Sequence, residues 1–388
     1  MQSFQELYVK LNQQQQDAVN AIEGPVMIIA GPGTGKTQIL ATRILNILSK
    51  TDAQPQNILC LTYTEAGATA MQKRLSQFMG ADAFKIPIFT FHGLCNKIIQ
   101  ERPEKFSRRE LRVMDELDKI DLIQGIIESL PAQSLLKSYQ EDAQVTRRDL
   151  SKVWDLMQSE GISASDFRTW ITGLLEPEAF KLAFPDAVYK VSRGNYKAGD
   201  IKPNEYEKYS KYWARATEAA DLFETYKEAK AKSGLYEFSD MLDWVANAFD
   251  NDEEILLDQQ EQYHYVLVDE YQDTSGLQNR ILHQLISFWG DEPNCFVVGD
   301  DDQSVYAFQG AKVSNMLDFA KRYKTALKTI VLTQNYRSTQ AILDASKNLI
   351  DNNQLRLISQ IPGLSKHLIA SGENLEFPHI EPSVKLFL

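Results

Sequence analysis

The chain has 388 residues, of which 43% are hydrophobic and 24% are charged. These proportions are ordinary for a globular protein with an apolar core, and they exclude disordered, collagen-like and disulfide-dense chains. At about 150 residues per domain, the length predicts two or three domains. The net charge of −12, from 53 acidic and 41 basic residues, argues by itself against a nucleic-acid partner. Net charge, however, does not determine what a single groove can bind.

The three cysteines, Cys60, Cys95 and Cys295, form no CxxC pair. We therefore expect free thiols in a reducing cytoplasm, and neither a zinc site nor an iron–sulfur site. No apolar run reaches the roughly 18 residues that a membrane span requires, and the N-terminus lacks a signal-peptide pattern. The expected location is cytoplasmic, with no membrane partner.

Short, continuous apolar runs occur in two parts of the chain and predict strands that are buried on both faces of a parallel sheet. Between about residues 101 and 230 such runs are absent, and the sequence is polar with helical periodicity. We therefore expect an α/β fold whose parallel sheet is flanked by helices and interrupted by a mostly helical insertion. The predicted strands are 26–29, 58–61, 86–89, 265–268, 295–298 and 329–332.

Within this insertion, the segment 187–215 carries seven Lys or Arg residues against three acidic ones, interleaved with aromatic residues. Basic and aromatic residues together suit single-stranded nucleic acid, through phosphate attraction and base stacking. A solvated helical face with packed tyrosines explains the same pattern. Both interpretations stay open. The aromatic residues are Tyr189, Tyr196, Tyr206, Tyr209, Tyr212 and Trp213.

A phosphate-binding loop is predicted between the strand 26–29 and the helical pattern 38–48. Its glycines let backbone N–H groups turn toward phosphates, and the following helix N-terminus adds positive potential. Lys36 can reach the β- and γ-phosphates, and Thr37 can offer its hydroxyl to Mg²⁺. Ala30 stands where the strict pattern has glycine, at the strand end, so we expect little effect. The loop is Ala30, Gly31, Pro32, Gly33, Thr34, Gly35, Lys36 and Thr37.

A carboxylate pair follows the predicted strand 265–268, at the end where open α/β sheets bind ligands. Asp269 is expected to hold Mg²⁺, directly or through water. Glu270 is expected to orient and deprotonate the attacking water in phosphoryl transfer. The pair alone is weak evidence, but together with a phosphate loop it predicts an ATP-hydrolysing site.

At Asp269-Glu270-Tyr271-Gln272-Asp273 the chain resembles the UvrD/Rep/PcrA-type superfamily 1 DNA helicases. The resemblance spans most of the chain and is weak only in the helical insertion and the last few dozen residues. Its motifs occur in the family order. Besides the phosphate loop, they are Leu11 to Val19 (LNQQQQDAV), Leu61 to Thr64 (LTYT), Phe89 to His92 (FTFH), Val298 to Tyr306 (VGDDDQSVY) and Gln334 to Ser338 (QNYRS).

The resemblance implies an ATP site with Mg²⁺. In it the Gln15 amide reads the adenine edge, which suits an amide because it both donates and accepts. Tyr336 stacks on the base, and Arg337 clamps the γ-phosphate. Gln303 senses the γ-phosphate and links it to the DNA groove. Arg43 matches a family position near the nucleotide, although a surface helix arginine fits its place in the sequence nearly as well.

The resemblance also implies a single-stranded DNA groove lined by Tyr63, Thr64, His92, Tyr306 and Phe308. Flat rings stack on bases of any sequence, as a motor that moves along DNA requires. Core packing is the alternative for each ring. The family commonly reads Trp-Arg-Gly-Ala where this chain has Phe308-Gln309-Gly310-Ala311. This difference removes one charged contact.

The implied fold is a P-loop NTPase of the RecA-like type. The expected domains are 1–100 with 231–325 (the ATP-binding motor domain), 101–230 (the helical insertion) and 326–388 (the start of a second, incomplete motor domain). The chain then reads as an N-terminal fragment that does not unwind DNA alone.

The implied activity of the complete protein is 3′→5′ translocation on single-stranded DNA with unwinding of 3′-tailed duplex, in DNA repair or replication. The alternatives are the helicase subunit of a helicase–nuclease and a nucleotide-gated DNA-binding protein without unwinding activity. Protein partners cannot be inferred from the sequence.

Overall fold

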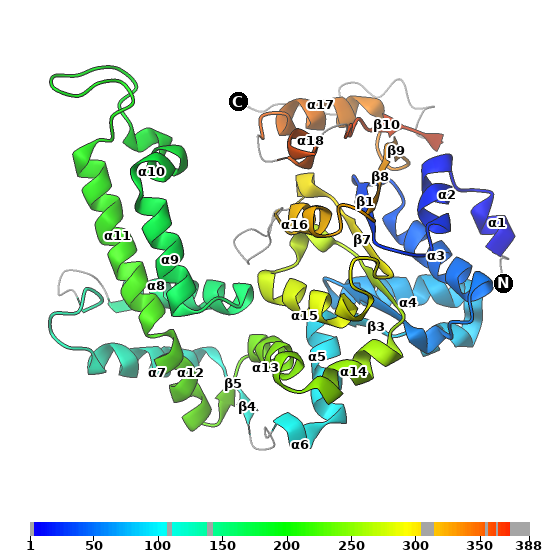
Figure 1. Cartoon of the computed structure of the whole chain (residues 1–388), viewed down its shortest axis with the longest axis horizontal. Helices are drawn as coiled ribbons and strands as arrows, with labels where there is room; N and C mark the ends of the chain where they lie inside the picture. Colours follow the sequence, from blue (N-terminus) through cyan, green and yellow to red (C-terminus); the bar gives the residue numbers. More distant parts are fainter. Residues whose placement is uncertain are drawn as a thin grey trace. The chain divides into compact units, whose positions relative to one another are not determined.

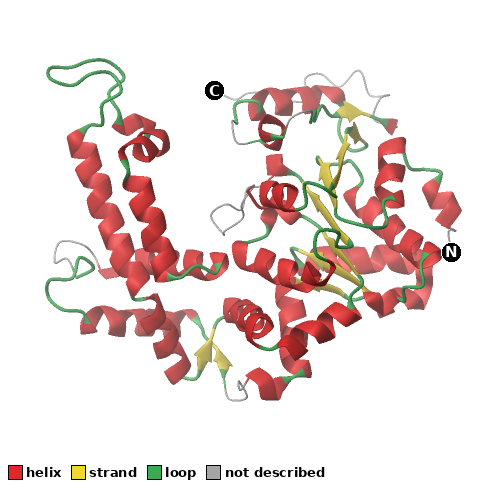
Figure 2. Ribbon diagram, viewed as in Figure 1, coloured by secondary structure: helices red, strands yellow, loops and turns green. Residues whose placement is uncertain are grey.

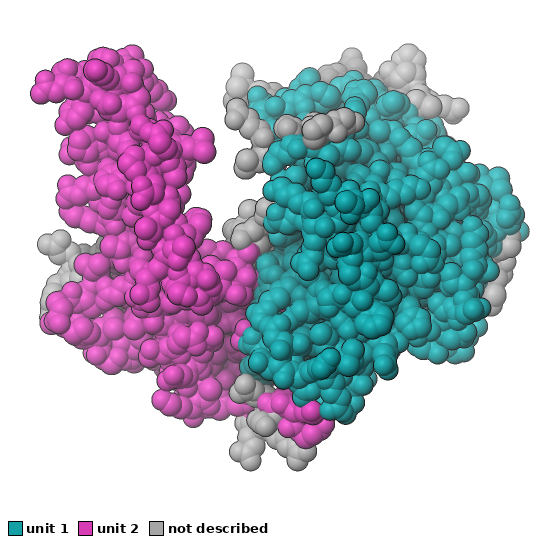
Figure 3. Space-filling view, in the orientation of Figure 1, with its two compact units in different colours: residues 1–102, 244–388 teal, residues 103–243 magenta. Residues whose placement is uncertain are grey.

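The computed structural model describes residues 4–106, 111–137, 143–303, 314–353, 356–361 and 364–372. Contacts divide the chain into two compact units (Figure 3). The first comprises residues 1–102 and 244–388, and the second comprises residues 103–243. No helix in the described ranges is both long and apolar enough to cross a membrane.

The first unit contains a six-stranded parallel sheet in the order β3-β2-β6-β7-β1-β8. Every residue of β1, β2, β6 and β7 is buried, as continuous apolar runs predict. The expected α/β parallel fold is confirmed, and all six predicted strands occur. The strands are β1 (Val26–Ala30), β2 (Ile58–Thr62), β3 (Ile88–Thr90), β6 (Tyr265–Val268), β7 (Cys295–Gly299) and β8 (Lys328–Leu332).

Helices flank this sheet (Figures 1 and 2). Two of them begin within three residues of a strand, and a threonine caps the first turn of each: Thr64 of α4 accepts the N–H of Gly67, and Thr90 of α5 accepts the N–H of Gly93. Helix α13 connects the two units along the chain. The helices are α1 (Phe4–Tyr8), α2 (Gln13–Asn20), α3 (Lys36–Lys50), α4 (Glu65–Met79), α5 (Phe91–Glu101), α13 (Phe238–Asn251), α14 (Glu253–Gln262), α15 (Gly276–Ile286), α16 (Ser314–Arg322), α17 (Gln340–Ile350) and α18 (Leu357–Gln360).

Strand β8 corrects the predicted domain boundary at residue 326. It pairs in parallel with β1, with Val26 opposite Lys328 and Ala30 opposite Leu332, so it completes the first sheet. A separate two-stranded parallel sheet follows, formed by β9 (Gln334–Asn335) and β10 (Ile369–Ala370). The chain therefore leaves the first sheet after Leu332 rather than at residue 326.

The second unit is mostly helical, as expected, and also holds a small parallel sheet that the sequence did not predict. Its core includes Trp154, which stacks on Tyr226 with ring centroids 4.5 Å apart and donates from its indole nitrogen to the carbonyl of Ala219. Its elements are α6 (Pro103–Phe106), β4 (Arg112–Val113), α7 (Glu116–Ser129), α8 (Ala143–Glu160), α9 (Ala164–Leu175), α10 (Pro177–Ala183), α11 (Pro203–Asp221), α12 (Phe223–Lys232) and β5 (Leu235–Tyr236).

Much of the basic and aromatic segment 187–215 is engaged within this unit. Tyr206 and Tyr209 pack edge-on against Phe180, and Lys208 and Lys211 form ion pairs with neighbouring glutamates of α11. These contacts fit the packed-helix interpretation. The exposed Tyr196 instead stacks on Tyr189, with ring centroids 5.0 Å apart. A nucleic-acid role for that part of the segment stays a prediction.

Candidate active site

Four adjacent strands bring the predicted ATP residues to one edge of the sheet. Strands β6, β7, β1 and β8 are parallel neighbours, so their carboxyl ends lie side by side. Asp269 and Glu270 follow β6, Gln303 lies just beyond β7, and the phosphate loop follows β1. Tyr336 and Arg337 follow β8 and β9. Residues from distant parts of the sequence therefore meet where open parallel sheets bind ligands.

The phosphate loop is held by hydrogen bonds from its own residues and from α2. Gly33 and Gly35 have φ angles of 72° and 88°, which glycine adopts without strain. The Thr34 hydroxyl donates to the carbonyl of Gly31 at 2.7 Å. The Gln15 amide donates to the carbonyl of Thr34 at 2.9 Å. Ala30 is the last residue of β1 and is fully buried, so its methyl group faces the core.

Gln15 also has a local role that sequence reasoning missed. Its side-chain carbonyl accepts the backbone N–H of Asn12 at 3.0 Å, and the Asn12 side chain accepts the N–H of Gln15, which completes a capping box at the start of α2. One amide hydrogen and one lone pair of Gln15 remain for a base. Adenine reading by Gln15 stays a prediction.

Lys36 and Glu270 form an ion pair across the site, with 2.6 Å between the amine and Oε2. The Lys36 side chain is largely buried, with 13% exposed. Glu270 adopts φ 50°, and it is the one non-glycine residue with positive φ in the described part of the chain. Such a conformation is strained for an L-residue, and it breaks the extended backbone that follows β6. The pair brings the predicted phosphate ligand and the predicted base together.

Asp269 and Thr37 are the predicted Mg²⁺ ligands. Burial and then the adjacent Glu270 raise the pKa of Asp269 to about 6, and the opposing effect of the Lys36 amine is smaller. Asp269 accepts the backbone N–H of Glu270 at 3.0 Å. A carboxylate and a hydroxyl are hard oxygen donors of the type Mg²⁺ prefers. These residues therefore fit a magnesium ion.

Gln272 connects the ends of two strands that form the site, a role that its place in the sequence does not indicate. Its amide nitrogen donates to Glu270 Oε2 at 3.0 Å, and its amide oxygen accepts the backbone N–H of Asp300 at 2.9 Å. Gln272 is 1% exposed. The Glu270 carboxylate is thus held from the β7 side as well as by Lys36.

Asn335 attaches the Tyr336–Arg337 turn to the phosphate loop. Its side-chain oxygen accepts the backbone N–H groups of Arg337 and Ser338 at 2.8 and 2.7 Å, and its nitrogen donates to the carbonyl of Pro32. Asn335 is fully buried. The asparagine of the QNYRS motif therefore holds the turn against the phosphate loop. This role depends on a contact with Pro32, which is far away in the sequence.

The candidate nucleotide groups on this turn face outward. The Tyr336 backbone N–H donates to the carbonyl of Gly33 at 2.8 Å, and its ring is 41% exposed. The Tyr336 hydroxyl accepts from Asn12 at 2.9 Å and donates to Gln334 at 2.7 Å. Arg337 is also exposed. Both side chains are therefore accessible to a ligand from solvent.

Arg43 corrects a predicted nucleotide contact. It is 1% exposed, and its guanidinium donates to three backbone carbonyls at the end of α2 and lies over the Phe296 ring, 4.2 Å from the centroid. Burial lowers its pKa to about 9. The side chain therefore satisfies the carbonyl groups at the end of α2. Arg43 is neither a nucleotide contact nor a surface arginine in this structure.

The candidate DNA residues follow β2 and β3, the strands beside β6. Tyr63 and Thr64 come directly after β2, and His92 lies in the first turn of α5 after β3. Thr90 donates to Glu65 at 2.8 Å, which ties these two strand ends together. Burial lowers the pKa of His92, against the effect of Glu65. Tyr306 and Phe308 lie outside the described residues, so their roles stay predictions.

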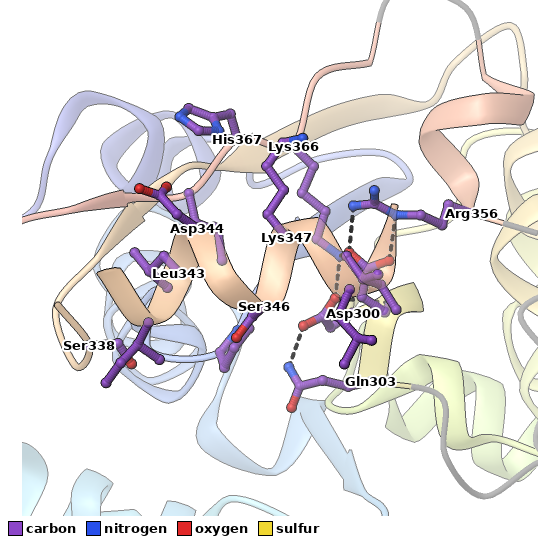
Figure 4. A pocket seen from close by; sticks show the side chains of 16 residues that line it. Asp300, Gln303, Ser338, Leu343, Asp344, Ser346, Lys347, Arg356, Lys366 and His367 are labelled. Carbon is purple, nitrogen blue, oxygen red and sulfur yellow. Dashed lines mark hydrogen bonds and ion pairs between the residues drawn. The ribbon is translucent and has the colours of Figure 1, made fainter. Parts of the chain in front are cut away.

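A cavity of about 380 Å³ lies beside the phosphate loop, between the end of β7 and helix α17 (Figure 4). Pro32, Gln303, Leu343 and Lys366 are among its lining residues. Gln303 does not point freely into this space, because its amide nitrogen donates to the Asp300 carboxylate. In this structure the predicted γ-phosphate sensor is therefore held by a neighbouring aspartate.

Comparison with known proteins identifies relatives of this chain. The chain is 31% identical over 348 residues to the ATP-dependent DNA helicase PcrA of Bacillus subtilis, an alignment that covers 89% of this chain and 40% of that protein. It is 30% identical over 347 residues to PcrA of Staphylococcus aureus, covering 89% and 40%. For PcrA of Staphylococcus epidermidis the identity is 30% over 351 residues, covering 90% and 41%. The chain thus spans about 40% of the length of the curated relatives it matches.

A family model gives the assignment directly. The model of the UvrD/REP helicase N-terminal domain matches residues 11–324. That range contains the whole six-stranded sheet except β8, together with the phosphate loop and the Asp269–Glu270 pair. Since the match covers well over half of the chain, the protein belongs to the UvrD/REP helicase family.

Proposed function

We propose that the protein is an ATP-dependent DNA helicase that translocates 3′→5′ along single-stranded DNA and separates duplex ahead of it. The observation that carries the proposal is that the candidate ATP and DNA residues lie at one edge of the same sheet. The candidate ATP residues follow β6, β7, β1 and β8, and the candidate DNA residues follow β2 and β3 of the same sheet. A change at the nucleotide can therefore reach the DNA groove through one rigid element. The direction of movement is the one that the family resemblance implies.

In this proposal ATP binds over the phosphate loop, and its phosphates replace Glu270 as the partner of Lys36. The loop N–H groups and the α3 N-terminus hold the phosphates, Tyr336 stacks on the base, and Arg337 approaches the γ-phosphate. Mg²⁺, held by Thr37 and Asp269, supplies charge neutralisation for the phosphates when bound.

Released from Lys36, the Glu270 carboxylate is held by Gln272 and can accept a proton from the attacking water. Gln303 contacts the γ-phosphate and links the nucleotide site to the DNA groove. ATP binding and hydrolysis then favour two different conformations, and the strand moves because its affinity differs between them.

For DNA, the half-buried Tyr63 and His92 and the exposed Thr64, which follow β2 and β3, offer stacking and hydrogen-bonding groups. Stacking is tolerant of sequence, as translocation requires. We place this activity on chromosomal DNA in the cytoplasm, in repair or replication, with single-stranded DNA and 3′-tailed duplex as substrates.

The test is ATP hydrolysis by the full-length protein with and without single-stranded DNA, followed by strand displacement on 3′-tailed and 5′-tailed duplexes. We expect stimulation that weakens with salt, and displacement of the 3′-tailed substrate alone. Tyr63→Ala or His92→Ala should weaken strand binding by about 1–3 kcal/mol. Phe288→Ala is the matched control: this ring is 67% exposed but lies near the amino ends of the strands, beside His264 and Asn294.

Other outcomes distinguish the alternatives. Nucleotide-dependent DNA binding without strand displacement would favour a gated binding protein. Cleavage of the displaced strand would favour a helicase–nuclease. Absence of any DNA effect on hydrolysis would overturn the proposal.

A further inference from the structure

A buried ion cluster joins the three consecutive aspartates after β7 to the chain beyond α17 (Figure 4). The Lys366 amine contacts the carboxylates of Asp300, Asp301 and Asp302, the last two at 2.9 and 2.8 Å. Arg356 binds Asp302 through two nitrogens, at 2.7 and 2.8 Å. Each aspartate is therefore held by a cation from a segment more than 50 residues away in the sequence.

Lys366 is the counter-ion of this cluster. Its side chain is 2% exposed, and the side chains of Asp300 and Asp301 are fully buried. Burial by itself would lower the pKa of Lys366, but the three carboxylates outweigh burial and raise it, so the amine stays charged. Buried charges are stable only when paired. The three carboxylates are close enough together to share a metal ion, and the Lys366 amine already supplies their positive charge.

Asp300 connects Lys366 with both candidate catalytic side chains. Its carboxylate accepts from the Gln303 amide as well as from Lys366. Its backbone N–H donates to Gln272, which in turn donates to Glu270. One aspartate thus fixes the predicted γ-phosphate sensor on one side and, through one glutamine, the predicted base on the other.

The backbone that carries Lys366 is attached to the nucleotide-binding turn. Ile369 and Ala370 of β10 pair with Gln334 and Asn335 of β9, and Asn335 binds the phosphate loop. Lys366 lies three residues before β10. The β9–β10 sheet therefore links the segment that carries Lys366 to the turn that carries Tyr336 and Arg337.

We propose that Lys366 is a positioning residue for ATP hydrolysis, which orients Gln303 and Glu270 by fixing Asp300. The proposal rests on the proposed ATP-hydrolysing function and adds a residue that contacts no nucleotide. Its contribution is to the transition state rather than to ATP affinity, because its amine binds the aspartates and not the phosphate loop, Gln15 or Tyr336.

The experiment compares Lys366→Met with Arg356→Met in the full-length protein, by steady-state ATP hydrolysis and urea unfolding. Arg356 is the matched control, because it pairs with the same run of aspartates but contacts neither Asp300 nor Gln303. We expect both variants to be less stable than the wild type. Only Lys366→Met should lower kcat, by about 10- to 100-fold with little change in KM for ATP, as misplacement of catalytic groups does. Equal kcat values for the two variants would overturn the inference.

A double-mutant cycle separates positioning from general destabilisation. If Lys366 acts through Asp300 on Gln303, then Lys366→Met should cause much less further loss of kcat in a Gln303→Ala background. Independent, multiplicative losses would contradict the proposal. If Lys366→Met does not fold, Lys366→Gln, which keeps a hydrogen-bond donor, enters the same cycle. Hydrolysis that survives Lys36→Ala would overturn the proposed function itself, whereas Lys36-dependent hydrolysis that is insensitive to Lys366 would overturn this inference alone.

Discussion

The amine of Lys36 lies 2.6 Å from the carboxylate of Glu270, so the predicted phosphate ligand and the predicted base neutralise each other in this structure. Phosphate and carboxylate compete for one cation. Binding of ATP therefore has to break this pair, and the free energy needed to break it lowers the affinity for the nucleotide. Without ATP, the pair compensates the charge of the largely buried Lys36.

Glu270→Gln should abolish ATP turnover without weakening ATP binding. The amide cannot accept a proton from water, and it competes less strongly than a carboxylate for Lys36, so affinity should be equal or tighter. Turnover should fall by about 10²- to 10⁴-fold. Calorimetry and steady-state hydrolysis measure the two effects, with Glu254→Gln on the surface of α14 as the control. Retention of more than about a tenth of the wild-type rate would assign the base to another residue.

Gly33→Ala and Gly24→Ala should have similar effects on stability but different effects on ATP binding, because only the first adds a steric clash to the backbone strain. Both glycines have φ near +75°, and either substitution should reduce stability by about 1–2 kcal/mol. A Cβ at Gly33 would lie 2.6 Å from the Cβ of Arg337, whereas a Cβ at Gly24 would meet nothing within 4 Å. Only Gly33→Ala should displace the turn and weaken ATP binding, by about tenfold or more. Equal affinities in calorimetry would contradict this role of Gly33.

Arg43→Met should destabilise the fold and leave ATP affinity unchanged. The substitution leaves three backbone carbonyls at the end of α2 without their donors. Buried unsatisfied polar groups cost about 1–3 kcal/mol each, so the free energy of unfolding should fall by about 3 kcal/mol or more. Arg280→Met, which breaks a partly exposed pair with Asp250, should cost less than about 1 kcal/mol. Urea unfolding tests this difference, and weaker ATP binding at normal stability would restore the nucleotide interpretation.

His283 should make the protein less stable in mild acid. Its ring lies among Phe319 and Tyr323, and burial followed by the nearby Arg322 lowers its pKa to about 4. An unfolded histidine titrates near 6.5, so between these values the unfolded chain binds a proton that the folded chain excludes, and stability falls as pH falls.

Between pH 7.5 and 5 this group alone should cost about 2 kcal/mol. Urea unfolding at the two pH values should show a smaller pH-dependent loss in His283→Asn than in the wild type. His264→Asn, at an exposed histidine, should keep the wild-type dependence. The same loss in all three proteins would contradict the assignment to His283.

The features that sequence predicted well are those encoded over a few residues. The strand at 26–30, the glycine loop after it and the Asp269–Glu270 pair are local patterns, and the structure places them together because parallel strands end at one edge. The expected start of β3 at Ile86 was two residues early, since Pro87 has no N–H for a ladder.

Features that depend on contacts between residues far apart in the sequence could not be predicted from local patterns. Arg43 looked like a helix arginine because its acceptors at the end of α2 become neighbours only after folding. Lys366 belongs to no motif, and its partner Asp300 is 66 residues away. Strand β8 was expected as a strand, but whether it joined the first sheet or a second one depends on its pairing with β1. Long-range pairing, rather than local propensity, determines each of these.

The short connection between β8 and β9 determines how the site can move. Leu332 is fixed in the six-stranded sheet, and both the N–H and the hydroxyl of Thr333 donate to the side chain of Gln14, so this connection is anchored to α2. Beyond it, the N–H of Tyr336 donates to the carbonyl of Gly33 in the phosphate loop. The turn that carries Tyr336 and Arg337 is therefore held from two sides before any nucleotide arrives. Its backbone has little conformational entropy left to lose on binding, so the turn is preorganised for a ligand and can shift only together with the loop and α2.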